Sequence, residues 1–399
     1  FKKRGQDRRY PIGVVGQFNR LCTLLVTVLG DYLYIEGGSI STPTGGRTQV
    51  NETLSIPLKE GWASNAVQAK TIPHPDGMYS VDKHGTWAGP EGESLYRWGG
   101  DQGLNVPRGF SPELFMMQAD GQGGGSWSTI SPSNHDLFQG TKAGQDRASA
   151  SCDGVGYFIG GISKSSTDFQ DQIMSTPDLI RYNMSTREWR KETSHDLNPP
   201  NGGIQLAQAV CVPGFANHSL VMVLGGKDPI DKRGESAADR DLAAINFYDP
   251  HVQKWYPNQP TSFENEGPQA REQFCSVGVP SKNNTFEIFV FGGLRASDRY
   301  FYNDVWILSL PAFRWFRGPS DSSVRIAHRC AVVGKRQMIS VGGLDGGTTH
   351  GFERNDTVMN GIRLLDMTDL VWRDSYDPSL DEYDSPDIIK EWYQSGYDI

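Results

Sequence analysis

The sequence lacks any apolar run long enough to cross a bilayer and, outside residues 1–9, any dense cluster of basic residues. Its most apolar stretch, residues 21–29, is broken by polar residues and is far shorter than the roughly 20 residues that a membrane-spanning helix needs. The net charge is −9, whereas nucleic-acid recognition requires a basic face. We therefore expect no nucleic-acid partner, and membrane attachment only through a span outside residues 1–399.

Residues suited to metal binding are sparse. The eight histidines show no metal-ligand spacing, and the five cysteines include no CxxC pair, which is the usual signature of a structural zinc site. We accordingly expect no metal, no cofactor and no catalytic residues.

Glycine and aromatic residues, by contrast, are plentiful, with 46 Gly, 10 Trp, 15 Tyr and 18 Phe. Six glycine doublets each close a short run of aromatic and β-branched residues, a pattern typical of a strand that enters a turn. The doublets recur at similar intervals along the chain. They are Gly37-Gly38, Gly99-Gly100, Gly160-Gly161, Gly225-Gly226, Gly292-Gly293 and Gly342-Gly343.

A tryptophan follows each doublet at a similar distance. The six are Trp62, Trp127, Trp189, Trp255, Trp315 and Trp372. Such regularity indicates an internal repeat. Each unit predicts two strands, a glycine doublet, a long loop, a third strand, a turn and a fourth strand that carries the tryptophan.

This pattern resembles the kelch repeat, and the resemblance covers residues 17–376. It implies an all-β fold, a six-bladed β-propeller of four-stranded antiparallel blades. Residues 1–16 would form an N-terminal segment, and ring closure has two alternatives: either each blade is complete in itself, or residues 10–15 add a strand to the last sheet. The acidic residues 377–399 are expected to form a solvated stalk or tail.

The repeat units are longer than a typical kelch unit of about 50 residues. Most of the extra residues fall between the glycine doublet and the third strand. Insertions at one point of a repeat collect on one face of the molecule, which is often the face that binds. We expect this face to engage a partner.

Five Asn-x-Ser/Thr sequons fall where the repeat predicts turns or strand edges, as glycosylation requires. They are Asn51, Asn183, Asn217, Asn283 and Asn355. They favour a secreted or cell-surface glycoprotein, similar to the extracellular kelch proteins of filamentous fungi, in which a leader, a propeller, a single span and a cytoplasmic tail follow one another. A cytosolic protein with chance sequons is the alternative.

The cysteines Cys22, Cys152, Cys211, Cys275 and Cys330 each precede the glycine doublet of their own unit. We expect them at one repeated position in the innermost strand of a blade. A small, apolar, buried side chain suits that position, which favours free thiols. A disulfide between neighbouring blades is the alternative.

Arg147, Arg271 and Arg325 each stand four or five residues before a cysteine, and His328 follows Arg325 by three. They resemble the Arg and His that open the first kelch strand near the mouth of the channel. A group of arginines there would form a cationic funnel on an acidic protein, suited to an acidic peptide or an anionic glycan. Alternatively, each arginine hydrogen-bonds to carbonyls of the next blade.

Arg295, Arg299 and Tyr300 lie in an aromatic-rich loop after the fifth doublet. Aromatic and arginine side chains are enriched at protein interfaces, and aromatic rings also stack on sugars. This loop predicts a second contact surface; anchoring of the loop itself is the alternative.

These features predict a non-enzymatic recognition ectodomain that engages a protein, an acidic peptide or a glycan through its long loops and channel mouth. The main alternative is a secreted copper radical oxidase similar to galactose or glyoxal oxidase. Those enzymes share the repeat architecture but need two Tyr, two His and a Tyr-Cys cross-link, a set that we cannot place in this sequence. A sialidase-type hydrolase and a cytosolic adaptor are further alternatives.

Overall fold

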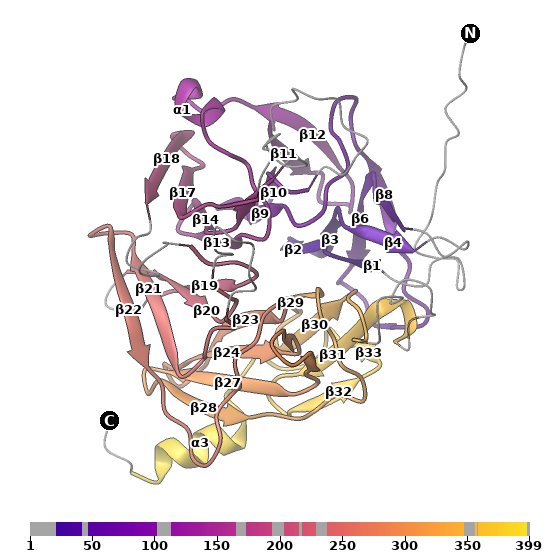
Figure 1. Ribbon diagram of the computed structural model, residues 1–399. Coiled ribbons are helices and arrows are strands. Elements are labelled where there is room, and N and C mark those ends of the chain that lie inside the picture. Colours follow the sequence, from indigo (N-terminus) through magenta and orange to yellow (C-terminus); the bar gives the residue numbers. More distant parts are fainter. Residues whose placement is uncertain are drawn as a thin grey trace.

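The computed structural model describes residues 21–41, 47–101, 113–164, 173–193, 203–214, 218–228, 238–346, 356 and 358–396. Six four-stranded antiparallel sheets surround a central axis (Figure 1). Each sheet is one blade, and its strands follow one another along the chain. The predicted six-bladed β-propeller is confirmed.

The four strands of each blade run from the axis outward in chain order. Blade one contains β2 (Leu25–Leu29), β3 (Tyr32–Glu36), β6 (Glu52–Pro57) and β8 (Lys70–Pro73). Blade two contains β9 (Gly85–Ala88), β10 (Ser94–Trp98), β11 (Leu114–Ala119) and β12 (Gly125–Ile130). Blade three contains β13 (Ala148–Cys152), β14 (Val155–Ile159), β17 (Asp178–Asn183) and β18 (Glu188–Thr193).

Blades four to six repeat the same order. Blade four contains β19 (Gln208–Val212), β20 (Leu220–Leu224), β21 (Ala244–Asp249) and β22 (Lys254–Pro260). Blade five contains β23 (Cys275–Pro280), β24 (Phe286–Phe291), β27 (Val305–Leu310) and β28 (Arg314–Arg317). Blade six contains β29 (Arg329–Val333), β30 (Gln337–Val341), β31 (Ile362–Asp366) and β32 (Val371–Arg373).

Smaller elements accompany the blades. One three-stranded sheet contains β1 (Leu21–Cys22), β4 (Ser39–Ser41) and β5 (Arg47–Gln49). The two-stranded ribbons are β15 (Ile162–Ser163) with β16 (Met174–Ser175), β25 (Leu294–Arg295) with β26 (Tyr300–Phe301), and β7 (Trp62–Ala63) with β33 (Ser375–Tyr376). The helices are α1 (His135–Gln139), a 3-10 turn (Met359–Gly361) and α3 (Asp387–Gln394). No helix among the described residues is both long and apolar enough to traverse a bilayer.

Burial explains why these residues form strands. The second strand of a blade packs against neighbouring blades on both faces, and so β24 is buried along its whole length. The first strand alternates between buried and half-buried residues, as in β13, because successive side chains of a strand point to opposite faces. The apolar clusters therefore lie between adjacent blades, as the one between blades four and five does.

The glycine doublets end the second strands, as predicted. Both glycines of every doublet have positive φ, as in Gly160 (70°) and Gly161 (90°). A Cβ on Gly160 would lie 2.1 Å from the carbonyl oxygen of Ile204 in the next blade. The N–H of Gly161 donates to that same carbonyl at 2.6 Å. Only glycine combines this conformation with such a close approach.

Five of the six tryptophans lie on fourth strands, as expected; Trp62 does not. The fourth strand of blade one is β8, and Trp62 lies in β7, which pairs with β33 from the end of blade six. The Trp62 ring packs on Tyr376, with ring centroids 5.3 Å apart. The exception has a physical reason, since this tryptophan packs in the joint between the first and last blades.

The ring closes by packing, with no strand exchanged between the described sheets. The six innermost strands contact one another in an unbroken circle, including β2 with β29. Blades one and six share an apolar cluster that includes Leu33 and Ile339. Each described blade has its own four strands. Residues 10–15, which would add the strand of the second closure alternative, lie outside the described residues.

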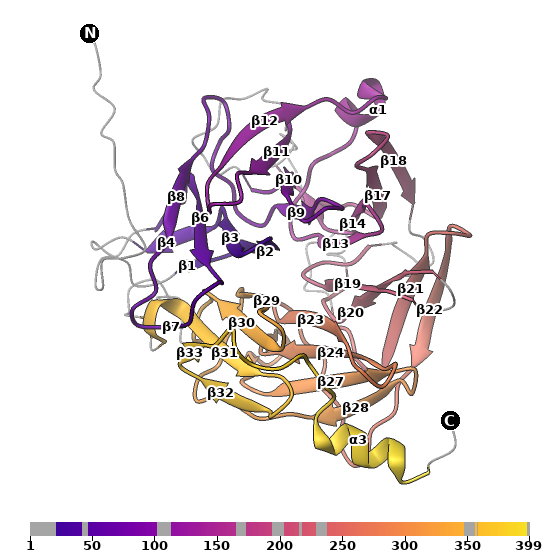
Figure 2. The same cartoon turned by 180° about the vertical axis from the view of Figure 1, so that it is seen from behind.

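Residues 377–396 differ from the expected solvated tail. They fold back on blade five, where α3 lies beside β28 in both views (Figures 1 and 2). Ile389 is fully buried, and Trp392 and Tyr393 pack beside it. This spacing of i, i+3 and i+4 puts three apolar side chains on one helix face. The acidic C-terminal segment therefore contains an amphipathic helix.

Candidate functional site at the channel mouth

In every blade, the residue two positions before the first strand has a left-handed backbone, with φ between 53° and 57°, although none of these residues is glycine. Such a conformation is uncommon for other residue types. We call this set the axial ring: Thr23, Lys83, Asp146, Leu206, Gln273 and Ala327. Its recurrence in all six blades shows that the fold itself imposes this turn.

Backbone hydrogen bonds join the axial ring from blade to blade. In each bond, the N–H of one ring residue donates to the carbonyl of the ring residue in the preceding blade, at 3.0 to 3.3 Å. The five pairs are Thr23 to Ala327, Lys83 to Thr23, Leu206 to Asp146, Gln273 to Leu206, and Ala327 to Gln273. Between blades two and three an ion pair spans the gap, with Lys83 Nζ 3.3 Å from Asp146 Oδ1.

The axial ring lines a cavity at the end of the channel, together with Arg147, Ala207, Gln208 and Arg329. The cavity measures about 30 Å³. A buried water needs roughly 10–15 Å³, so this level of the channel has room for about two waters. It admits a small ion or the tip of a side chain rather than an entire ligand.

This cavity is also on the face that carries the loop insertions. In each blade, the residue before the axial ring residue pairs with the residue after the glycine doublet, as Gln145 does with Ile162. The channel mouth and the segments that follow the doublets thus share one face of the disc. A partner bound to that face would reach both.

The mouth of the channel is cationic. Lys83, Arg147 and Arg329 line it against one carboxylate, that of Asp146. Among the described residues, no carboxylate lies within ion-pairing distance of the Arg329 guanidinium, which donates one hydrogen bond to the His328 carbonyl at 3.1 Å. Burial lowers the pKa of Arg329, and Asp146 opposes that shift.

Arg147 is the one predicted arginine that lines the cavity. Its Nε and Nη2 donate to the carbonyls of Ala143 and Lys142, at 3.1 and 3.0 Å. These bonds hold the guanidinium beside the axis. The positive charge of Arg147 is thereby fixed at the channel mouth.

Arg271 and Arg325 lie elsewhere. Both are buried, and each pairs within its own blade with an acid that precedes the third strand: Arg271 with Asp304 at 2.7 Å, and Arg325 with Asp356 at 2.6 Å. Each stands two residues before the axial ring residue of its own blade, whereas Arg147 stands one residue after the axial ring residue of blade three. The three arginines are therefore not equivalent positions, and ligand binding by Arg271 and Arg325 remains a prediction.

His328 follows the axial ring residue of blade six and is fully buried. Its ring meets that of Phe291 edge-on, with centroids 5.2 Å apart. Burial, with the charges of Arg325 and Arg329, lowers the pKa of His328 to about 3. The imidazole is thus neutral near pH 7 and packs in the wall rather than projecting into the cavity.

The loop predicted as a second contact surface forms the β25–β26 hairpin. Arg295 pairs with Asp298 at 2.6 Å, and its guanidinium lies 5.7 Å from the ring centre of Tyr300. Tyr300 and Arg299 are exposed. This hairpin presents an aromatic ring and a guanidinium to solvent, and its role in binding remains a prediction.

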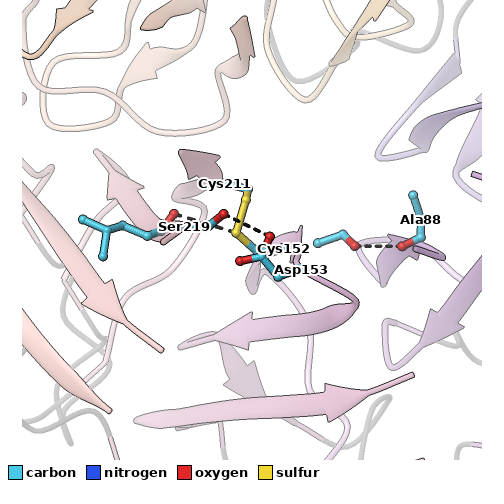
Figure 3. Close-up of a disulfide and its surroundings, with 7 residues drawn as sticks. Ala88, Cys152, Asp153, Cys211 and Ser219 are labelled. Atoms are coloured by element: carbon cyan, nitrogen blue, oxygen red, sulfur yellow. Dashed lines mark hydrogen bonds between the residues drawn. A yellow bond between two sulfur atoms is a disulfide. The ribbon is translucent and has the colours of Figure 1, made fainter. Parts of the chain in front are cut away.

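The expectation that all five cysteines are free thiols is wrong. Cys152 pairs with Cys211, and Cys275 with Cys330, with Cα atoms 5.4 and 5.5 Å apart; Cys22 is buried and takes part in neither bridge. Figure 3 shows the first disulfide, where Ser219 of blade four donates to Asp153 of blade three beside it. Each bridge joins the innermost strands of neighbouring blades, which approach within the usual bridging distance.

The cysteines also do not occupy one repeated position. Counted from the axial ring residue of the same blade, Cys152 and Cys211 stand six and five residues later, and Cys275 and Cys330 two and three. The two bridges therefore lie at different depths along the inner strands. Only the Cys275–Cys330 bridge is close to the axial ring.

Three of the five predicted glycosylation sites lie on described residues. Asn51 and Asn283 are exposed, and Asn183 is half-buried in a turn where its Oδ1 accepts the backbone N–H of Ser185 and Thr186. Asn217 and Asn355 lie outside the described residues. Glycosylation of all five remains a prediction.

Sequence reasoning missed Lys83, Arg329 and Gln273 as channel residues. The axial ring position carries a different residue type in every blade, so composition gives no signal for it. In every blade, the residue after the glycine doublet pairs with the residue that directly precedes the axial ring residue. An alignment of the six units on this pair would have identified the axial ring position.

Comparison with known proteins points to the same repeat. No protein-family model matches the sequence. A kelch repeat-containing protein of Arthroderma benhamiae is 26% identical over 200 residues, which cover 47% of this chain and 27% of that protein. A kelch domain-containing protein 10 homolog of Drosophila melanogaster is 25% identical over 183 residues, or 43% of this chain and 29% of that protein.

The chain is a kelch-repeat β-propeller. The matched part spans less than a third of either relative, so the similarity concerns the repeat and not the activity of a whole protein. Kelch propellers generally bind proteins. A protein-binding scaffold is the coarse function that fits this kelch propeller.

Proposed function

We propose that this kelch propeller binds an acidic segment of a partner protein at its channel mouth. The observation that carries the proposal is the cationic cavity in the axial ring, where Lys83, Arg147 and Arg329 face one carboxylate. The nearby hairpin with Arg295 and Tyr300 would contact the flanks of the same segment.

The energetics favour an anionic guest. A guanidinium removed from bulk water without a carboxylate partner is unfavourable, and Arg329 is in that position. A carboxylate that enters the cavity would form charge-assisted hydrogen bonds, each worth about 1.5–3 kcal/mol. The overall charge of −9 would repel acidic chains elsewhere on the surface and so focus them on the mouth.

The size of the cavity limits how either predicted class of guest could enter. A space of about 30 Å³ accepts a carboxylate but not a sugar ring, so an anionic glycan would insert only its carboxylate and leave its rings on the loops above. We favour an acidic peptide over an anionic glycan because kelch propellers generally bind proteins.

Selection from a displayed random peptide library on the immobilised propeller tests this function. We expect enriched sequences to share an Asp or Glu, and their capture to fall when Arg329 is replaced by Gln. Enrichment of peptides without a common acidic residue, or equal capture by both proteins, would overturn the proposal.

We further propose that the propeller works on the extracellular side of a membrane or in a secreted protein. The exposed sequon residues Asn51 and Asn283 support this location, as do the two disulfides, because disulfides persist mainly in oxidising compartments. Endoglycosidase treatment of native material should raise its mobility in a gel. An unchanged band would contradict the proposal.

The copper radical oxidase remains the alternative function. Copper-loaded protein incubated with a panel of sugars and aldehydes should release no peroxide if the propeller is a binding module. Peroxide release that depends on copper and on one of these substrates would favour the oxidase.

A further inference from the structure

We propose that Cys275, His328 and Cys330 form a metal site when the Cys275–Cys330 disulfide is reduced, and that it takes a thiophilic cation of the Zn²⁺ class. The site goes beyond the binding of an acidic peptide. It rests neither on that binding nor on the oxidising extracellular location proposed above, because it forms only where a reductant opens the bridge. It joins blade five to blade six just outside the axial ring.

The three side chains already converge. Their ligand atoms, two sulfurs and one imidazole nitrogen, all lie within 4.8 Å of one another. Two thiolates on one zinc at about 2.3 Å would stand roughly 3.8 Å apart, with the imidazole nitrogen closer still. Opening of the disulfide to that separation therefore needs only a small movement of the two inner strands.

His328 gives independent support. It is fully buried, and apart from a contact with the backbone carbonyl of Phe291 that falls outside normal hydrogen-bond geometry, its ring nitrogens have no hydrogen-bond partner among the described residues. Buried polar atoms are normally satisfied, and a metal ion would satisfy one of these nitrogens. A Cys₂His set also leaves a fourth position for water or another ligand.

The chemistry balances with a dithiol as reductant. Thiol–disulfide exchange transfers two electrons and two protons to the Cys275–Cys330 bridge, so that the S–S bond breaks, two thiols form and the dithiol becomes a disulfide. Binding of Zn²⁺ then releases the two thiol protons. The two thiolates neutralise the ion, so the nearby charge of Arg329 faces a neutral site. Cys330 is partly exposed and offers the route of access.

The chain contains two matched controls. The Cys152–Cys211 bridge joins neighbouring inner strands in the same way, but the residues that correspond to His328 in its two blades are Arg147 and Ala207. His84 corresponds to His328 in blade two, is also buried without hydrogen bonds to its ring among the described residues, and belongs to no cluster of potential metal ligands in that part of the chain.

Zinc and cobalt uptake by the tag-free, dithiol-reduced protein test the site. We expect about one zinc per chain after removal of free metal, and a sulfur-to-cobalt charge-transfer band with Co²⁺. The variants H328Q and C330S should lose the zinc and the band. The variants H84Q and C152S/C211S should keep both, and the oxidised protein should bind neither metal.

Circular dichroism and melting curves establish that each variant is folded. If H328Q unfolds, H328N and C275S provide the same comparison, because each removes or displaces one ligand. Three results would overturn the proposal: no zinc in the reduced wild-type protein, equal zinc in the folded H328Q or H328N variant, or loss of the zinc in C152S/C211S.

Discussion

The backbone N–H of Thr23 donates a hydrogen bond to the carbonyl of Ala327, 3.0 Å away, and so links the first blade to the last. A ring of sheets can also close by a strand shared between the two ends of the chain. Here the described blades are each complete, and this bond continues a chain of equivalent bonds through the axial ring. The β7–β33 pair and an apolar cluster complete the joint.

The packing of α3 on blade five predicts that Ile389 contributes to stability. Ile389→Ala removes a fully buried side chain and should lower the free energy of unfolding by about 3 kcal/mol. Ile388, the neighbouring residue, is 45% exposed, and Ile388→Ala should have little effect. Urea denaturation measures both, and equal effects would mean that α3 does not pack as described.

The first glycine of a doublet is expected to resist substitution for two reasons, conformation and contact. Gly30, which lies outside the doublets, serves as the comparison. It has φ of 54° with open space around its missing Cβ, so Gly30→Ala should cost about 1 kcal/mol through conformation alone. Gly160→Ala adds a close contact with Ile204 and should be clearly more destabilising. Thermal melts of the two variants separate the cost of the backbone conformation from the cost of the contact with Ile204. Similar melting temperatures would show that this contact does not explain the need for glycine at position 160.

Glu36 links blade one to blade two inside the core. Its carboxylate lies 2.8 Å from Arg97 Nη1 and 3.2 Å from His74 Nε2. Burial would raise the pKa of Glu36, but His74 and Arg97 together outweigh burial and hold this pKa well below its usual range. Glu36→Gln leaves Arg97 buried without a carboxylate and should destabilise the fold by about 3 kcal/mol at pH 7.

The lowered pKa of Glu36 also predicts how the stability of the protein changes with pH. Because the pKa of Glu36 is lower in the folded than in the unfolded chain, its stabilising contribution is fully present above the unfolded value of about 4. The contribution is lost as pH falls below that value toward the folded pKa. The difference between wild type and Glu36→Gln in urea midpoint should therefore shrink between pH 5 and pH 3. A constant or growing difference would contradict the assignment.

As a surface control, Glu188→Gln breaks an exposed pair with Arg190. Exposed pairs contribute between zero and about 1 kcal/mol. This variant should therefore unfold nearly as the wild type does at every pH in the series.

The fold followed from the sequence because its signals repeat. Gly160 and Trp189 each belong to a set of six, and the physical demands on them, positive φ and burial between blades, recur in each unit. Trp62 broke the pattern because long-range pairing of β7 with β33 depends on where the chain closes, which no local pattern encodes. Likewise Ile389 lies in an acidic segment, where composition suggested solvent and only helical spacing indicated a packed face.

The candidate site was less predictable. Arg147 was found because a basic residue near the first strand is a visible feature. Lys83 belongs to the axial ring, whose residue type differs in every blade, and Arg329 lines the cavity two residues after the ring residue Ala327. Arg271 and Arg325 have the sequence appearance of channel residues, yet they pair with acids that come later in their own blades. Partners of this kind depend on tertiary contacts between residues far apart in the chain.

The affinity of an acidic peptide, chosen by the library selection, for wild type and Arg329→Gln tests the central claim most directly. Fluorescence anisotropy should show about 10- to 100-fold weaker binding to Arg329→Gln, as expected for one lost charge-assisted hydrogen bond, with Arg190→Gln as the surface control. Binding should also weaken with added salt. Equal affinity of wild type and the folded Arg329→Gln variant would contradict a binding site at the channel mouth.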